Sequence, residues 1–104
     1  MPQPIPATVT WDTTLGKGTV ADIVVPSGNG ATVIQWTCDP SVASFTISGL
    51  DPNEFTPAQS NPDVTTFQTT DRDDTAQDYT YTVSATHAAT GARSSHDPKI
   101  TNEP

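Results

Sequence analysis

The densest group of chemically competent side chains in this sequence is an acidic cluster in a loop. It comprises Asp71, Asp73, Asp74 and Asp78. Ca²⁺ takes about six to eight oxygen ligands, which one loop seldom supplies, so Asp39, Asp51 or Glu54 would have to converge on it. The competing interpretation is a solvated turn in which Asp side chains cap backbone amides. The solvated turn is the interpretation we prefer, and a Ca²⁺ site is the alternative. Apart from Ca²⁺, we expect no cofactor.

Two histidines, His87 and His96, are further candidate metal ligands. Positions 88–91 predict the tip of a hairpin, which would pair His87 near Ala92. His96 would then lie about four residues further along, or roughly 13 Å away, too far to share one ion. The run 94–97 holds the residue types of a hydrolytic triad, but neighbours on a strand point to opposite faces. We expect no catalytic residues and no enzymatic activity.

The carboxylates of Asp97 and Glu103 are a candidate partner-binding pair near the C-terminus. The same segment has a structural interpretation. Pro98 cannot donate to a strand ladder and Asp97 can bond nearby amides, which favours a bulge. Ile100 would be a packed anchor that places Glu103, and the tail would seal a sheet edge.

Carbohydrate binding would require exposed aromatic rings. Trp11 and Phe55 are the candidates for that role. Stacking on a sugar requires an accessible ring face, so burial of both residues would count against this function.

Seven runs rich in β-branched and aromatic residues predict the strands that must position these side chains. They span residues 5–11, 19–25, 32–37, 43–48, 64–70, 79–87 and 92–101. Clusters of Gly, Pro, Asn and Asp separate them, and no segment has a helical period. This spacing predicts an all-β protein, with residues 1–104 forming a single antiparallel β-sandwich of about seven strands. Alternation from Tyr79 to Ala85 predicts an inward-facing row.

Two positions resemble those of immunoglobulin-like domains, and the resemblance implies that the fold is a single immunoglobulin-like antiparallel β-sandwich of about seven strands. Trp36 lies centrally on the third predicted strand, where such sandwiches bury a tryptophan. Tyr79 follows a turn at residues 74–76. This turn resembles the one that precedes the corner tyrosine in the sixth strand of immunoglobulin-like domains. The resemblance implies that the Tyr79 hydroxyl bonds upstream backbone and that Tyr81 occupies the core position of the second cysteine.

The C-terminal pairs Asp97-Pro98 and Glu103-Pro104, which follow Thr90-Gly91, resemble those of the DP-EP family of small bacterial proteins. That family takes its name from such pairs. The resemblance covers roughly the last thirty residues clearly. It implies a compact β-sandwich of this length and brings no activity, cofactor or catalytic residue.

The charge of the chain restricts its partners. Twelve acidic residues against four basic ones give a net charge of −8. Such a surface repels phosphate, so we expect no nucleic-acid binding and no attraction to anionic membranes. A protein partner or self-association through sheet edges fits better. The function we expect is a non-catalytic binding or protein-interaction module. The alternative is a Ca²⁺-stabilised adhesion-type domain using the loop Asp71–Asp78.

The compartment is indicated by two conflicting cues. Positions 1–6 have no feature of a secretory signal, and Cys38 is the sole cysteine, which we expect to be half-buried at a strand end. These features predict a cytoplasmic protein. The low charged fraction of 15% is closer to surface-exposed β-domains, so export without a cleaved signal stays open.

Overall fold

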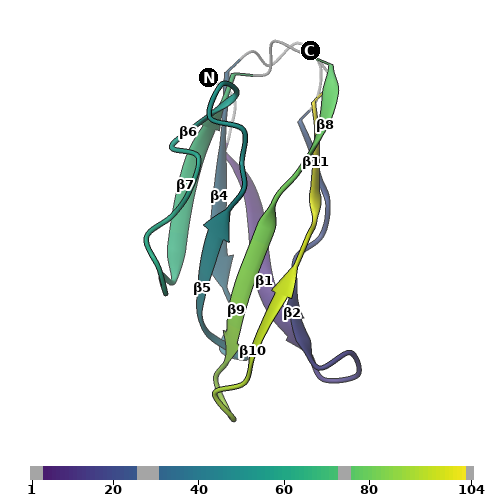
Figure 1. Ribbon diagram of the computed structural model, residues 1–104, viewed down its shortest axis with the longest axis vertical. Helices are drawn as coiled ribbons and strands as arrows, with labels where there is room; N and C mark the ends of the chain where they lie inside the picture. The colour runs from purple at the N-terminus through teal and green to yellow at the C-terminus, as the bar shows by residue number, and fades with distance from the viewer. Residues whose placement is uncertain (1–3, 26–30, 73–75, 103–104) are drawn as a thin grey trace.

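Eleven short strands make up the regular secondary structure in the computed structural model, which describes residues 4–25, 31–72 and 76–102 (Figure 1). They are β1 (Ile5–Asp12), β2 (Lys17–Thr19), β3 (Ile23–Val25), β4 (Thr32–Cys38), β5 (Val42–Ser48), β6 (Phe55–Thr56), β7 (Thr66–Asp71), β8 (Gln77–Thr80), β9 (Thr82–His87), β10 (Arg93–His96) and β11 (Lys99–Asn102). No helix occurs among these residues, so none could cross a membrane. The predicted all-β class is confirmed.

The strand number exceeds the predicted seven because three predicted strands are each divided in two and because β6 lies in a segment where no strand was predicted. The run 19–25 gives β2, which pairs with β1, and β3, which pairs with β11. The run 79–87 gives β8, which pairs with β11, and β9, which lies between β5 and β10. Pro98 divides the last run, and its carbonyl accepts a hydrogen bond from the Tyr81 amide at 3.1 Å. Each division lies where the chain changes its pairing partner.

Three sheets result, with strand orders β2-β1-β4-β7-β6, β10-β9-β5 and β3-β11-β8. Most neighbours are antiparallel, but β1 pairs with β4 and β11 with β3 in parallel. The expectation of a purely antiparallel arrangement is therefore wrong. Parallel neighbours need long crossovers, and here whole strands lie between the partners in the sequence.

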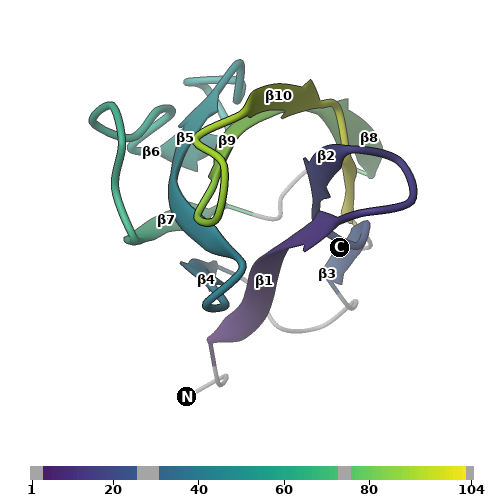
Figure 2. The ribbon, with the colours of Figure 1, turned by 90° about the horizontal axis from the view of Figure 1, so that it is seen from below.

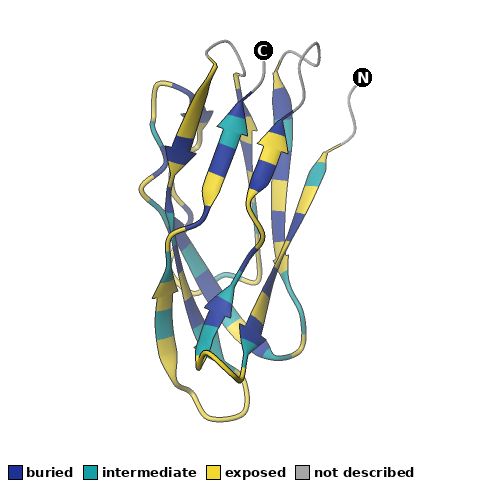
Figure 3. Ribbon diagram, turned by 90° about the vertical axis from the view of Figure 1, so that its right-hand side faces the viewer, coloured by how far each residue is buried: buried dark blue, intermediate teal, exposed yellow. Residues whose placement is uncertain are grey.

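The inward faces of these strands form one core. Viewed along the long axis, the strands surround that core (Figure 2), and buried and exposed residues alternate along them (Figure 3). The predicted inward row of Tyr79, Tyr81, Val83 and Ala85 is buried, as are Ile34, Trp36, Phe45 and Ile47. Burial of this apolar surface is the main force that holds the sheets together.

Trp36 and Tyr81 form the centre of the core. Both are almost fully buried, and the Trp36 Nε1 donates a hydrogen bond to the Tyr81 hydroxyl at 3.0 Å. Their ring centroids lie 5.6 Å apart in an edge-on arrangement, and Phe67 stacks on Trp36 at the same separation. The predicted core positions of Trp36 and Tyr81 are confirmed.

Candidate functional site

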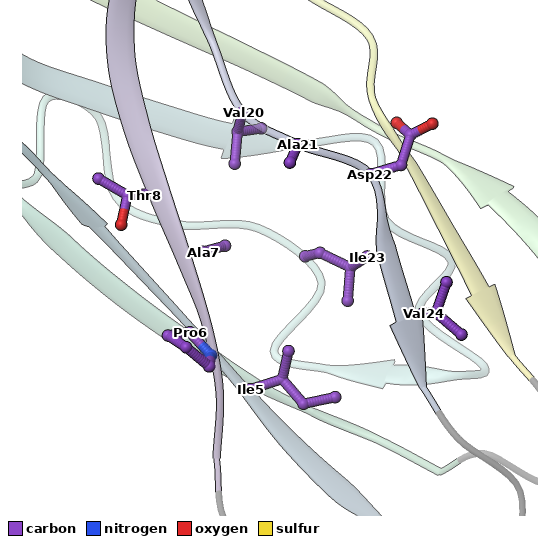
Figure 4. A pocket seen from close by; sticks show the side chains of 9 residues that line it. All are labelled: Ile5, Pro6, Ala7, Thr8, Val20, Ala21, Asp22, Ile23 and Val24. Carbon is purple, nitrogen blue, oxygen red and sulfur yellow. The ribbon is translucent and has the colours of Figure 1, made fainter.

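A pocket of about 290 Å³ lies between β1 and the segment that carries β3 (Figure 4). Its lining consists of Ile5, Pro6, Ala7, Thr8, Val20, Ala21, Asp22, Ile23 and Val24. Most of these side chains are aliphatic, with one hydroxyl and one carboxylate among them. The pocket is therefore suited to an apolar group.

The pocket lies where two strand edges separate. β1 pairs with β2 only over residues 10–12, whereas its residues 5–9 pair with β4 on the other side. β3 is the last strand of its sheet and pairs with β11. Among the described strands, the outer edges of β3 and of the first half of β1 have no ladder partner. Pro6 leaves β1 with one backbone donor fewer.

Two residues give the pocket its chemical character. Val24 is one of two exposed large hydrophobic residues in the described parts of the chain, at 51% exposure. The Asp22 carboxylate accepts a hydrogen bond from the Lys99 amide at 3.0 Å, which fixes it against β11. The hydroxyl in the lining belongs to Thr8, and Asp22 supplies the carboxylate.

A second group of functional side chains is buried, and we call it the interior carboxylate cluster. It consists of Glu54 before β6, Asp71 at the end of β7, Tyr79 in β8 and Asn102 at the end of β11. The Asn102 Nδ2 donates to Glu54 Oε1 at 3.3 Å and to Asp71 Oδ1 at 3.0 Å. The Tyr79 hydroxyl donates to Glu54 Oε2 at 3.2 Å. The four side chains form one connected network.

Strand pairing brings this interior carboxylate cluster together. Phe55 pairs with Asp71, and the Arg72 amide donates to the Glu54 carbonyl at 2.9 Å. Burial, together with the nearby charge of Glu54, raises the pKa of Tyr79 to about 12. This end of the protein therefore concentrates negative charge in its interior.

The predicted acidic loop site is only partly described. Asp71 is buried rather than solvated, whereas Asp78 is exposed and forms an ion pair with Lys99 at 3.7 Å. Asp73 and Asp74 lie outside the described residues. Within the described ranges, no three His, Cys, Asp or Glu side chains form a metal-binding group. Ca²⁺ binding by this loop stays a prediction.

A Ca²⁺ site at the acidic loop would need further carboxylates close to it. Glu54 does lie close to Asp71, but Asp39 lies elsewhere. The Asp39 carboxylate accepts bonds from the Ser41 hydroxyl and amide, which lower its pKa. Asn102 was not anticipated at all. A polar residue at the end of a strand resembles a surface residue, and no local pattern distinguishes it.

The predicted partner-binding pair in the tail is also partly described. Asp97 is exposed and accepts a hydrogen bond from the Thr82 hydroxyl at 2.9 Å. Ile100 is fully buried, which confirms it as an anchor. Glu103 lies outside the described residues, so its pairing with Asp97 stays a prediction.

The two histidines occupy separate surroundings. The His87 amide donates to the Ala92 carbonyl at 2.7 Å, which confirms the predicted hairpin. The His87 ring stacks on Trp11 with centroids 4.6 Å apart. The His96 Nε2 lies 3.3 Å from the Val20 carbonyl oxygen. The two rings thus contact different elements, as the hairpin pairing implied.

The aromatic candidates for carbohydrate binding are both buried, with Trp11 at 8% exposure and Phe55 at 1%. Neither presents an open ring face, so neither can stack on a sugar, and the two residues give carbohydrate binding no support. The predicted partner of the Tyr79 hydroxyl is wrong, since this hydroxyl donates to the Glu54 carboxylate rather than to upstream backbone. Glu54 reaches Tyr79 through the β6–β7 pairing, which the local turn pattern does not encode.

Cys38 lies at the end of β4 and is half-buried, as predicted. Its Sγ lies 3.8 Å from the Thr65 carbonyl oxygen. Burial raises the pKa of the thiol, and the neighbouring Asp39 charge adds to the effect. The thiolate form that reacts is therefore disfavoured.

Comparison of the chain with models of known protein families and with curated proteins finds no match. The resemblance to the DP-EP family accordingly stays a prediction.

Proposed function

We propose that this protein is a non-catalytic binding module whose partner enters the pocket between β1 and β3. The observation that carries the proposal is the position of this apolar pocket between two unpaired strand edges. An extended peptide can add to such an edge through main-chain hydrogen bonds while a pocket takes one of its side chains.

The partner we propose is an extended segment of another protein that carries an aliphatic side chain. The pocket volume of about 290 Å³ is at the small end for ligand sites, which fits one or two side chains better than a large cofactor. The net charge of −8 favours a neutral or basic segment over an acidic one.

We propose an immunoglobulin-like sandwich as the architecture of the module. The buried Trp36 in β4 and the core position of Tyr81 support this assignment, as does the C-terminal resemblance to the DP-EP family. In such an architecture the sites lie on end loops and strand edges, because apolar residues fill the core.

The two exposed large hydrophobic residues of the described chain provide a matched test. Val24 borders the pocket at 51% exposure, and Leu15 lies in a turn outside it at 61%. Peptides would be selected from a random phage library against the full chain. We expect Val24→Arg to weaken the selected peptides at least about tenfold, because a charge replaces an apolar contact at the rim. Leu15→Arg is expected to leave their affinity unchanged.

Amide chemical shifts of the wild-type chain locate the bound peptide independently. Changes centred on residues 5–9 and 20–24 would support the proposed pocket. Equal affinities for the two arginine variants, or shift changes confined to other elements, would contradict it. Circular dichroism of each variant checks that the fold is retained.

A further inference from the structure

We propose that the partner segment forms a strand inserted between β1 and β3 and hydrogen-bonds to both of them. The inference rests on the proposed function and specifies how the partner lies in that pocket. It predicts the direction of the partner, the residue pattern that it carries and the main-chain groups that hold it. The bound segment would join the five-stranded sheet and the β3-β11-β8 sheet into one.

The first argument is the direction of the main-chain groups of β3. The Tyr81 amide donates to the Pro98 carbonyl at 3.1 Å, so the main-chain groups of Pro98 face the β8 side. These groups alternate sides along a strand, so those of Thr101 face β3, where Val24 lies at the same level. In a parallel ladder the groups of Thr101 bond to the two neighbours of Val24. The N–H and C=O of Val24 itself therefore point away from β11.

β1 presents a matching edge. The Trp11 amide donates to the Ser41 hydroxyl at 2.9 Å, and the Val9 carbonyl accepts from the Asp39 amide at 3.2 Å. Odd-numbered residues of β1 therefore direct their main-chain groups to the β4 side, and even-numbered residues direct theirs to the β2 side. The pairing with β2 covers only residues 10–12. Among the described strands, the N–H and C=O of Thr8 thus have no ladder partner.

These two edges lie on opposite sides of the pocket. Thr8 and Val24 both line it, and both are exposed. The side chains of Ile5, Ala7 and Ile23 lie between the two strands (Figure 4). Unpaired N–H and C=O groups on both sides of an apolar opening are a template for a further strand. A segment that added to one edge alone would leave the groups of the other edge without a partner.

The direction of the partner follows from the two edges. β1 and β11 run in opposite directions along the long axis (Figure 1), and β3 is parallel to β11. A partner antiparallel to β3 exchanges both hydrogen bonds of Val24 with one of its residues. It is then parallel to β1, where one partner residue bonds to the Pro6 carbonyl and to the Thr8 amide. This arrangement makes no use of the donor that Pro6 lacks.

Alternation determines the side chains that the partner carries. The partner residue opposite Val24 points outward, because Val24 is itself 51% exposed. Its two neighbours point inward, toward the aliphatic lining, and are therefore expected to be aliphatic. The partner pattern is an aliphatic residue, any residue except proline, and a second aliphatic residue. Proline is excluded because each N–H of the triplet bonds to one edge or the other.

Amide-to-ester replacement in the selected peptides tests the insertion on the wild-type chain. An ester removes one N–H donor and keeps every side chain. Consecutive N–H groups of an inserted strand bond to opposite edges, so an ester at any of the three triplet positions should weaken binding about fivefold or more. An ester outside the triplet is the matched control and should change the affinity by less than about twofold.

Amide hydrogen exchange of the protein gives a second readout. In the complex, the amides of Thr8 and Val24 should both exchange at least about tenfold more slowly, because each gains an acceptor. The amide of Val9, which faces β4, should change little.

A nitroxide at the N-terminus of the peptide tests the direction. In a partner antiparallel to β3, this label lies near the end of β3, so it should broaden the Val25 amide signal more than the Asp22 signal. The reverse order would overturn the proposed direction.

The outcomes separate this inference from the proposed function. Esters that are tolerated at alternate triplet positions, or slower exchange at only one of Thr8 and Val24, would overturn the insertion. Either result would indicate addition to a single edge and would leave the proposed binding module intact. Equal affinities of the peptides for Val24→Arg and Leu15→Arg would instead contradict the proposed function itself.

Discussion

Tyr79 and Tyr81 occupy alternate positions of one extended segment, so both side chains point into the core. Their hydroxyl groups have opposite roles. The Tyr81 hydroxyl accepts a hydrogen bond from Trp36, whereas the Tyr79 hydroxyl donates one to Glu54. The same residue type therefore closes an apolar core at one position and orients a buried carboxylate at the other.

Removal of the Tyr81 hydroxyl is expected to lower the free energy of unfolding. In Tyr81→Phe the buried Trp36 Nε1 would lose its acceptor, and an unsatisfied buried donor costs about 1–3 kcal/mol. Urea unfolding followed by tryptophan fluorescence should show that loss in the free energy of unfolding. Thr80→Val, at an exposed position of the same segment, should change it by less than about 0.5 kcal/mol. Equal stability of Tyr81→Phe and the wild type would show that the hydrogen bond contributes nothing.

The burial of individual residues followed from the sequence better than their polar partners did. Alternation alone places Trp36, Tyr79 and Tyr81 in the core. The acceptor of the Tyr79 hydroxyl could not be predicted, because Glu54 lies 25 positions earlier and approaches only through the β6–β7 pairing. Asn102 was missed for the same reason. Its role depends on two carboxylates from other strands.

At the scale of elements, the notable feature is the close approach of β2 to β9. A Cβ atom added at Gly18 would lie 2.4 Å from the Ala85 Cβ, closer than real side-chain contacts allow. The Gly18 amide also donates to the Ser94 hydroxyl at 2.8 Å. Gly18, which pairs with Trp11 of β1, thus lets the five-stranded sheet contact the β10-β9-β5 sheet.

Gly18→Ala should therefore destabilise the protein. The new methyl group has no space, and overpacking of a tight contact costs about 1–3 kcal/mol. The added change Ala85→Gly should recover part of the loss, since it removes the clashing atom. A double-mutant cycle by chemical denaturation measures the coupling between the two positions. If the two substitutions change the free energy of unfolding additively, the contact between β2 and β9 is not the cause of the destabilisation.

The positions of strands were predictable, but the points where they change sheets were not. A run such as 19–25 has one continuous apolar pattern, and nothing in it shows that β2 and β3 have different partners. The pocket lies at this change of partner, so it could not be inferred either. Parallel pairing of β1 with β4 was missed because hydrophobic alternation is the same in both orientations.

At the scale of the whole molecule, one core contains both tyrosines of the chain. Burial raises the pKa of Tyr79 to about 12 and that of Tyr81 to about 12. The nearby Glu54 charge also acts on Tyr79, while the bond from Trp36 opposes the effect at Tyr81. Ionisation of either residue is therefore coupled to loss of the common fold.

This coupling predicts alkaline unfolding. An unfolded tyrosine has a pKa of about 10, so the unfolded chain releases protons first as the pH rises. The stabilisation is fully present below about pH 10 and is lost as the pH rises toward 12, by about 2–3 kcal/mol for each tyrosine. Tyrosinate absorbance measures ionisation of these two residues alone. Its rise should coincide with loss of the circular dichroism signal.

The substitution Tyr81→Phe separates this mechanism from general charge repulsion in an acidic protein. Repulsion would be nearly the same in the variant, because the net charge near neutral pH does not change. Linkage to tyrosine ionisation would instead make its stability fall less steeply between pH 10 and 12, since one buried ionisable group is gone. Tyrosinate that forms near pH 10 while the fold persists would contradict the prediction, because it would mean that the core admits water at one or both rings.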